Sequence, residues 1–184
     1  RKIVHSQYHN ADTLNIRIAF HQRYSLQKEP YAAWLFRHYA FAPGMRILEI
    51  GCGNGSLWQG HLGVLEQVHS LMLTDFSPGM LETAKENLGT HPKITYQMAD
   101  IQALPFPDSA FDMVIANMML YHVPDLKKGL SEVARVLKEE GTFYCATYGE
   151  NGIIQYLETL LYEYGASNDM NKSFTLQNGM AKLE

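Results

Sequence analysis

Residues 45–56 read MRILEIGCGNGS, a short apolar run followed by a glycine-rich segment. Residues 47–50 predict a parallel strand buried on both faces, because Glu49 is their only polar side chain. Glycines follow at positions 51, 53 and 55. Glycine lets the chain turn sharply, reach positive φ and bring a ligand against bare backbone. The segment therefore predicts a ligand-binding turn at the end of a buried strand.

The residues after the glycines, 56–65, predict a helix that Asn54 or Ser56 would cap. Its first N–H groups would then point toward whatever occupies the turn. Two other kinds of ligand-binding turn fit less well. The dinucleotide pattern G-x-G-x-x-G requires glycine where Ser56 stands, and a phosphate-binding P-loop requires a lysine, which is absent between Arg46 and Lys85.

The composition predicts a single soluble domain with a hydrophobic core. Of the 184 residues, 46% are hydrophobic and 18% are charged, and the net charge is −4. No apolar run approaches the roughly 20 residues that cross a bilayer, and the first residues lack a signal-peptide pattern. The settings of Cys52 and Cys145 suggest neither a disulfide nor a metal site. We therefore expect a cytoplasmic protein without a metal and, since the sequence does not begin with methionine, part of a longer chain.

The first 40 residues differ in charge from the rest. They carry six of the fifteen Lys and Arg but two of the nineteen Asp and Glu, which gives +4 against −8 for the remainder. Apolar residues at helical spacing predict helices over 10–22 and 29–40. We expect residues 1–42 to form a helical cap or lid over a core domain, residues 43–184. A solvated basic face on a structural helix is an open alternative.

Residues 70–74 predict a second strand, which ends at Asp75. In a doubly wound sheet, a carboxylate about twenty residues beyond the glycines lies beside the first turn and can accept both hydroxyls of a ribose. A surface acid at a strand end is the alternative reading of Asp75. Ser77 and Pro78 predict a helix start, as cap and first-turn proline, and Gly89 predicts its end.

Strands and helices alternate along the rest of the chain. Further strands are predicted at 93–98, 113–116 and 143–147, and further helices after Asp125 as far as Gly141, and over 151–164 with Gly165 as C-cap. The polar tail 167–184 has room for one short element. Alternation through five units predicts an α/β fold with a doubly wound, mainly parallel, Rossmann-like sheet whose ligand-binding loops share the carboxyl edge.

Three segments resemble the class I methyltransferases that use S-adenosylmethionine. They are EIGCGNG at 49–55, DFSPGML at 75–81 and LPFPDSAFD at 104–112. The likeness covers about residues 45–148. The family's sheet continues with two more strands, the last antiparallel, and this chain has no sequence left for both, so we expect the C-terminal strands to be incomplete. The D/N-P-P-Y motif of enzymes that methylate amino groups is absent at 117–120, so DNA is not an expected partner.

The resemblance implies where the cofactor would bind. The ribose would lie on Asp75, the adenine between Phe76 or Met80 and Ile101, and the methionine end over the glycines. The full set of implied cofactor residues is Glu49, Gly51, Cys52, Gly53, Gly55, Asp75, Phe76, Met80, Asp100, Ile101 and Asn117. Glu49 and the backbone at Asn117 would serve the amino group, and Asp100 the edge of the adenine.

The resemblance also implies residues on the acceptor side. His122 is the one histidine near the expected mouth and is a candidate base, although a loop histidine bonded to backbone is an open alternative. Met118, Tyr121, Arg17 and Tyr24 are candidate acceptor or lid residues. Further apolar walls and basic groups are available from Tyr8, Phe20, Tyr31, Trp34 and Arg23.

The implied function is methyl transfer by in-line displacement to a small-molecule acceptor that the sequence does not identify, with S-adenosylhomocysteine as the product. Such a reaction needs alignment in a dry pocket and no metal. Two alternatives stay open, namely a non-catalytic S-adenosylmethionine-binding module and an NAD-dependent oxidoreductase. No membrane partner is expected, and the sequence predicts no oligomeric state.

Overall fold

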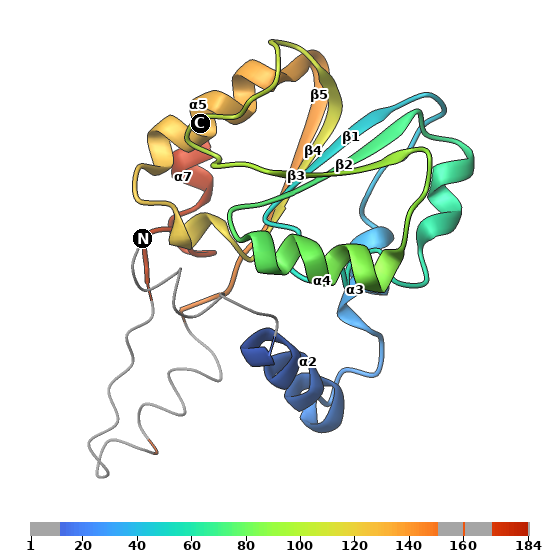
Figure 1. Cartoon of the computed structure of the whole chain (residues 1–184). Coiled ribbons are helices and arrows are strands. Elements are labelled where there is room, and N and C mark those ends of the chain that lie inside the picture. Colours follow the sequence, from blue (N-terminus) through green and yellow to red (C-terminus); the bar gives the residue numbers. More distant parts are fainter. Residues whose placement is uncertain (1–11, 151–159, 161–170, 184) are drawn as a thin grey trace.

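The computed structural model describes residues 12–150, 160 and 171–183, which form a five-stranded sheet with helices on both faces (Figure 1). All strand pairs are parallel and the spatial order is β3-β2-β1-β4-β5. The strands are β1 (Arg46–Ile50), β2 (Ser70–Asp75), β3 (Ile94–Met98), β4 (Phe111–Asn117) and β5 (Leu137–Ala146). The predicted doubly wound α/β fold is confirmed. Within the described ranges no helix is both long and apolar enough to span a membrane.

Side chains of β1 point alternately into two hydrophobic clusters, one on each face of the sheet. Ile47 faces the cluster that includes Ala84 of α4 (Pro78–Leu88), and Leu48 faces the cluster that includes Val133 of α5 (Leu126–Val136). Both β1 side chains have no exposed surface. Burial on both faces explains why this strand is almost continuously apolar.

The helix starts that follow β2 and β4 form as their sequences predict. The Ser77 side chain accepts a hydrogen bond from the backbone N–H of Met80, and Pro78 is the first residue of α4. The Asp125 carboxylate accepts from the backbone N–H of Lys128 at the start of α5. Each cap satisfies a donor that the first turn of a helix leaves without a partner.

The helix predicted over residues 56–65 is wrong. Turns fill most of this segment, and only a 3-10 helix, η1 (Leu62–Glu66), follows. Gly60 has φ of +78°, which an α-helix does not accommodate. The Trp58 side chain is also completely buried and reaches back beneath the glycine turn. The turn is therefore not followed by a helix N-terminus.

Gly141 does not end a helix either. Helix α5 ends at Val136 and β5 begins at the next residue, so Gly141 lies inside the strand. A Cβ there would lie 2.9 Å from the backbone oxygen of Lys138 and 2.7 Å from Leu137 Cδ1. Glycine is thus needed where β5 folds closely on itself, in the part where its register with β4 shifts.

The C-terminal residues contribute to the core. The helix predicted over 151–164, with Gly165 as its cap, falls outside the described residues apart from position 160. In the described tail, one short helix forms, α7 (Met180–Leu183). Phe174 is buried in the α5-side cluster, and its backbone oxygen accepts from the Thr147 hydroxyl. The tail therefore closes one face of the sheet beside β5.

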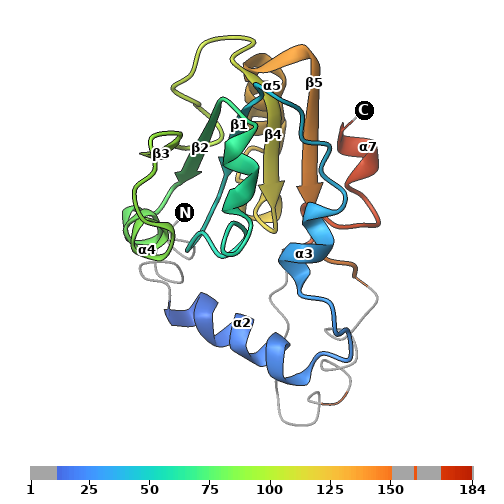
Figure 2. The same cartoon turned by 90° about the vertical axis from the view of Figure 1, so that its right-hand side faces the viewer.

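The N-terminal segment divides into two parts. Helix α3 (Tyr31–Phe36) and the residues after it join the α4-side cluster through Leu35 and Tyr39. Helix α2 (Asp12–Tyr24) lies beyond the carboxyl ends of the strands, and the arrowheads of β4 and β5 point toward α3 and α2 (Figure 2). The division into a cap, 1–42, and a core, 43–184, stays a prediction, but α3 packs as part of the core.

Candidate functional site

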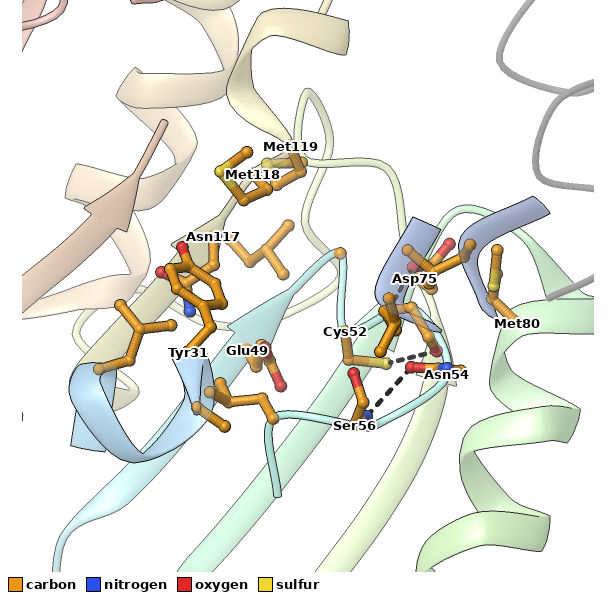
Figure 3. Close-up of a pocket in the computed structure, with 18 of the residues that line it drawn as sticks. Tyr31, Glu49, Cys52, Asn54, Ser56, Asp75, Met80, Asn117, Met118 and Met119 are labelled. Carbon is orange, nitrogen blue, oxygen red and sulfur yellow. Dashed lines mark hydrogen bonds between the residues drawn. The ribbon is translucent and has the colours of Figure 1, made fainter. Parts of the chain in front are cut away.

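A cleft of about 1830 Å³ opens at the carboxyl edge of the sheet. Its walls come from the glycine turn, the ends of β2, β3 and β4, and helices α2 and α3 (Figure 3). Strand β1 pairs with β2 on one side and β4 on the other, so the strand order reverses at β1, where doubly wound sheets bind ligands. Small-molecule pockets commonly have roughly 300–1,000 Å³, so this cleft is large for a ligand site.

The first two glycines of the turn line the cleft in conformations that favour glycine. Gly51 has φ of +73° and Gly53 has φ of +56°. A Cβ on Gly51 would lie 3.0 Å from Met119 side-chain atoms, and one on Gly53 would lie 3.2 Å from Leu14 Cδ2 of α2. The turn thus exposes backbone atoms, and the side chains of Met119 and Leu14, from two other segments, pack against it.

Gly55 has a different role from the other two glycines. It does not line the cleft, and a Cβ there would lie 2.8 Å from Leu88 Cδ1 of α4. Its expected contribution to cofactor binding is therefore indirect, through close packing of α4.

Cys52 lines the cleft, is 6% exposed, and donates its backbone N–H to Thr74 of β2 at 2.9 Å.

Asp75, at the end of β2, lies beside the glycine turn as the sequence predicts. Its Oδ2 accepts from the backbone N–H of Gly53 at 2.9 Å, and its Oδ1 accepts from the backbone N–H of Ser77 at 2.8 Å. Burial raises the pKa of Asp75, and the two N–H bonds oppose that rise. Each carboxylate oxygen has a further lone pair, so Asp75 can also accept hydroxyl groups in the cleft.

Glu49, near the end of β1, is a buried carboxyl in the floor of the cleft. Its side chain is 2% exposed, and its Oε2 accepts from Trp58 Nε1 at 2.5 Å. Burial raises the pKa of Glu49 to about 7, although the bond from Trp58 acts in the opposite direction. Trp58 was not predicted as part of the site, since nothing in its local sequence indicates a partner nine residues earlier.

Asn117, at the end of β4, has one side-chain atom in a hydrogen bond and one without a partner. Its Nδ2 donates to the Tyr39 hydroxyl at 2.7 Å, whereas its Oδ1 is buried and accepts no hydrogen bond. Among the described residues, it is the one buried side-chain nitrogen or oxygen without a partner. Burial is the main cause that raises the pKa of Tyr39. Tyr39 is a second residue that the sequence did not predict at this site.

The residues expected around an adenine all line the cleft. They are Phe76, Met80 and Ile101, and Phe76 is 43% exposed whereas the other two are almost fully buried. Asp100 also lines the cleft, and its Oδ1 accepts from the backbone N–H of Gln102 at 2.9 Å. Phe76 therefore has apolar surface available for contact with a ligand.

The segment after β4 supplies the expected acceptor side. Met118, Tyr121 and His122 line the cleft, and His122 ends a 3-10 turn, η2 (Leu120–His122). The rings of Tyr121 and His122 are 4.4 Å apart. Met118 has φ of +52°, an uncommon conformation for a residue other than glycine. Such conformations often occur at functional sites.

Helix α2 turns one face to the cleft, and Tyr24 is not on it. Tyr24 is 61% exposed and its ring packs on Phe20, 4.9 Å away. Tyr24 does not line the cleft, because the cleft-facing positions follow the helical repeat along another stripe, and its contact with an acceptor stays a prediction. The cleft-facing positions are Leu14, Ile18, His21 and Gln22. Arg17 belongs to α2, but its side chain lies outside the described residues, as does Tyr8.

Helix α3 provides an aromatic wall. Tyr31 and Trp34 both line the cleft, with ring centroids 6.4 Å apart and planes 12° apart. Trp34 also packs against His38, at 4.4 Å.

Arg23 does not line the cleft and lies 5.6 Å from the centre of the Tyr24 ring. In the described part of the chain, no three His, Cys, Asp or Glu residues gather as a metal site would require.

A family profile described as "Methyltransferase domain" matches residues 48–145, more than half of the chain. The matched range contains the glycine turn, Asp75 and the residues at the end of β4. These are the elements that form the floor of the cleft.

Known proteins share this part of the sequence. A demethylmenaquinone methyltransferase of Symbiobacterium thermophilum is 35% identical over 108 residues, 57% of this chain and 43% of the relative. A mitochondrial arginine-hydroxylase, NDUFAF5 of Rattus norvegicus, is 36% identical over 102 residues, 55% of this chain and 28% of the relative. The chain thus spans less than half the length of either protein.

A solved structure shows the same arrangement of elements. The trans-methyltransferase CalH, in complex with S-adenosylhomocysteine, is 28% identical, with a TM-score of 0.55, and the match covers 70% of this chain and 37% of that one. That structure is similar to this chain and contains the product form of the cofactor that the sequence implies.

Proposed function

The chain belongs to the methyltransferase domain family, and on that premise we propose that it binds S-adenosylmethionine and transfers a methyl group to a small-molecule acceptor. The observation that carries this proposal is the bond between Asp75 and the backbone of Gly53. It brings the hydroxyl-accepting carboxylate against the glycine turn, at the edge where β1 and β4 end. A cofactor with both a ribose and a charged amino-acid end would fit the Asp75 carboxylate and the neighbouring glycine turn.

The residues of the cleft would contact this cofactor at its ribose, its adenine and its methionine end. Asp75 would accept the ribose hydroxyls, and the adenine would lie between Phe76 and Ile101. The buried Glu49 carboxyl would face the ammonium of the methionine end, a position where an unpaired carboxylate would otherwise be costly. Gly51 and Gly53 would allow close approach of the ligand to the backbone.

S-adenosylmethionine supplies a methyl group bound to a positively charged sulfur, and S-adenosylhomocysteine is left when it departs. The protein's own contribution is to hold the acceptor in line and to keep water away. Met118 and Tyr121 would shape the acceptor side, and α2 would cover the open edge. His122, which lines the cleft, would take a proton from an acceptor hydroxyl or amine.

The alternative of a non-catalytic binding module stays open. One of the similar proteins is named an arginine-hydroxylase, an enzyme of another class, so likeness to this family does not by itself establish methyl transfer. The NAD-dependent alternative has no support from the matched family. A cytoplasmic location and the absence of a DNA partner stay predictions.

Two measurements on the wild-type chain test the proposal. Calorimetry should show that S-adenosylhomocysteine binds and that NAD does not. A panel of small metabolites should then be incubated with S-adenosylmethionine labelled in its methyl group, and the label should move to one chemical class. Failure of S-adenosylhomocysteine to bind would refute the cofactor assignment, whereas binding without transfer to any compound would favour the non-catalytic module.

A further inference from the structure

The buried Oδ1 of Asn117 is an incomplete hydrogen-bonding site in the wall of the cleft. A buried acceptor without a donor is destabilising. In the observed orientation Nδ2 donates to the Tyr39 hydroxyl at 2.7 Å, which leaves Oδ1 as the atom of the amide without a partner. Oδ1 can therefore accept a hydrogen bond from a ligand, because no donor in the described part of the chain bonds to it.

The position of Asn117 in the sheet shows what surrounds this oxygen. Asn117 shares one face of β4 with Met113 and Ile115, which belong to the α4-side cluster. Tyr31 of α3 and Asn117 both line the cleft, and Figure 3 shows them in the same part of it. Tyr31 also acts electrostatically on Tyr39, the partner of Asn117, so the three side chains are neighbours. The incomplete acceptor thus lies beside the aromatic wall.

The local environment favours a neutral donor over an ion. Burial raises the pKa of Glu49 to about 7, and burial is also the main cause that raises the pKa of Tyr39. An unpaired charge of either sign is therefore costly in this part of the cleft. Arg23, a candidate partner for an anionic acceptor, does not line the cleft.

We propose that the methyl acceptor is an aromatic compound that donates an O–H or N–H to Asn117 Oδ1 while its ring lies against Tyr31 and Trp34. This inference rests on the proposed function and specifies its substrate class. Tyr31 and Trp34 are 52% and 40% exposed, so their ring faces are available for contact. Asn117 would then act as a specificity residue, because an analogue without the donor leaves Oδ1 without a partner.

The test uses two probes that differ in one hydrogen-bond donor, 2-naphthol and 2-methoxynaphthalene. Their dissociation constants are measured by NMR titration on the protein saturated with S-adenosylhomocysteine. In the wild type, 2-naphthol should bind about tenfold more tightly, as a buried hydrogen bond of this kind provides. Asn117→Leu, which has a similar size but no acceptor, should remove that difference.

The aromatic wall has its own matched pair of variants. Trp34→Ala should weaken both probes about equally, because it removes stacking and leaves Asn117 in place. Phe20→Ala is the control, since Phe20 is an aromatic residue of α2 that is 57% exposed and does not line the cleft. Phe20→Ala should leave both dissociation constants unchanged.

Several outcomes would overturn the inference while leaving the proposed function intact. One is equal affinity of the two probes for the wild type, and another is no binding of either probe. A third is a loss of S-adenosylhomocysteine affinity of more than about tenfold in Asn117→Leu, which would assign Oδ1 to the cofactor's ammonium. Failure of S-adenosylhomocysteine to bind the wild type would instead refute the proposed function itself. Should Asn117→Leu not fold, Asn117→Ala provides the same comparison.

Discussion

The indole Nε1 of Trp58 donates a hydrogen bond of 2.5 Å to Oε2 of Glu49, and both side chains are almost completely buried. A buried carboxyl needs such a donor, because an unpaired one is costly. The bond also explains why residues 56–65 do not form the helix that their sequence predicts. Trp58 reaches back to Glu49, and the chain around it follows turns that allow this.

The first prediction concerns stability against pH. The pKa of Glu49 is raised from 4.5 to about 7 in the folded state, so the folded protein holds a proton that the unfolded chain releases over this range. The free energy of unfolding contributed by Glu49 is therefore greatest below about pH 4.5 and falls as pH rises to about 7. The total loss is roughly 3 kcal/mol.

Denaturant unfolding at about pH 5 and pH 8 measures this effect, with Glu49→Gln as the control. Glutamine keeps an acceptor for Trp58 but cannot ionise. The variant should thus lose less stability than the wild type between the two pH values. Parallel pH dependence in both proteins would contradict the prediction.

The second prediction concerns ligand affinity against pH. If the ammonium of S-adenosylhomocysteine lies beside Glu49, binding favours the ionised carboxyl, which must lose its proton below about pH 7. Affinity should then be about tenfold weaker at pH 6 than at pH 8. Calorimetry in buffers of different ionisation enthalpy should show proton release at pH 6. In Glu49→Gln both the pH dependence and the proton release should be much smaller.

The sequence predicts those parts of the site whose positions follow from the order of the strands and helices along the chain. Asp75 follows a strand that pairs with β1, and parallel strands place their carboxyl ends at one edge, so its contact with Gly53 was foreseeable. Ser77 and Pro78 act through local backbone geometry, which the sequence shows directly.

The parts that sequence reasoning missed depend on contacts between distant residues. Tyr39 and Asn117 are 78 positions apart, and nothing local to either one indicates their bond. Gly141 resembles a helix stop in sequence, yet the helix ends earlier because Leu137 already pairs with Phe111. In both cases tertiary packing, and not local preference, decides the outcome.

The third prediction is that Asp75→Ala weakens both S-adenosylmethionine and S-adenosylhomocysteine by roughly 1–3 kcal/mol, since the ribose loses a charged acceptor. The variant also loses the bond to the Gly53 N–H, so the turn should be less ordered. Calorimetric titration measures the change. Asp108→Ala is the matched control, because its carboxylate is 77% exposed and pairs with Arg135 away from the cleft. Unchanged affinity in Asp75→Ala would refute the pocket assignment.

The fourth prediction is that His122→Ala lowers turnover but changes cofactor affinity less than about threefold, as expected for a group on the acceptor side. The rate should be measured with the first acceptor found in the labelled-methyl panel. His61→Ala is the control, since His61 also lines the cleft but stacks on Phe36. Full turnover in His122→Ala would show that His122 is structural.

The last prediction is that α2 closes over the bound cofactor. Helix α2 touches the glycine turn, because Asn54 Nδ2 donates to Asn15 Oδ1 at 2.7 Å and Leu14 lies against Gly53. Among the described residues, α2 shares no large contact area with the strands of the sheet, and lids are drawn from weakly held segments. A ligand on the turn would add an apolar surface for the cleft-facing stripe of α2. Hydrogen exchange across α2 should therefore slow when S-adenosylhomocysteine is added, and Asn15→Ala should reduce the protection gained. Equal exchange in both states, together with full activity of a chain that begins at Glu29, would show that α2 does not act as a lid.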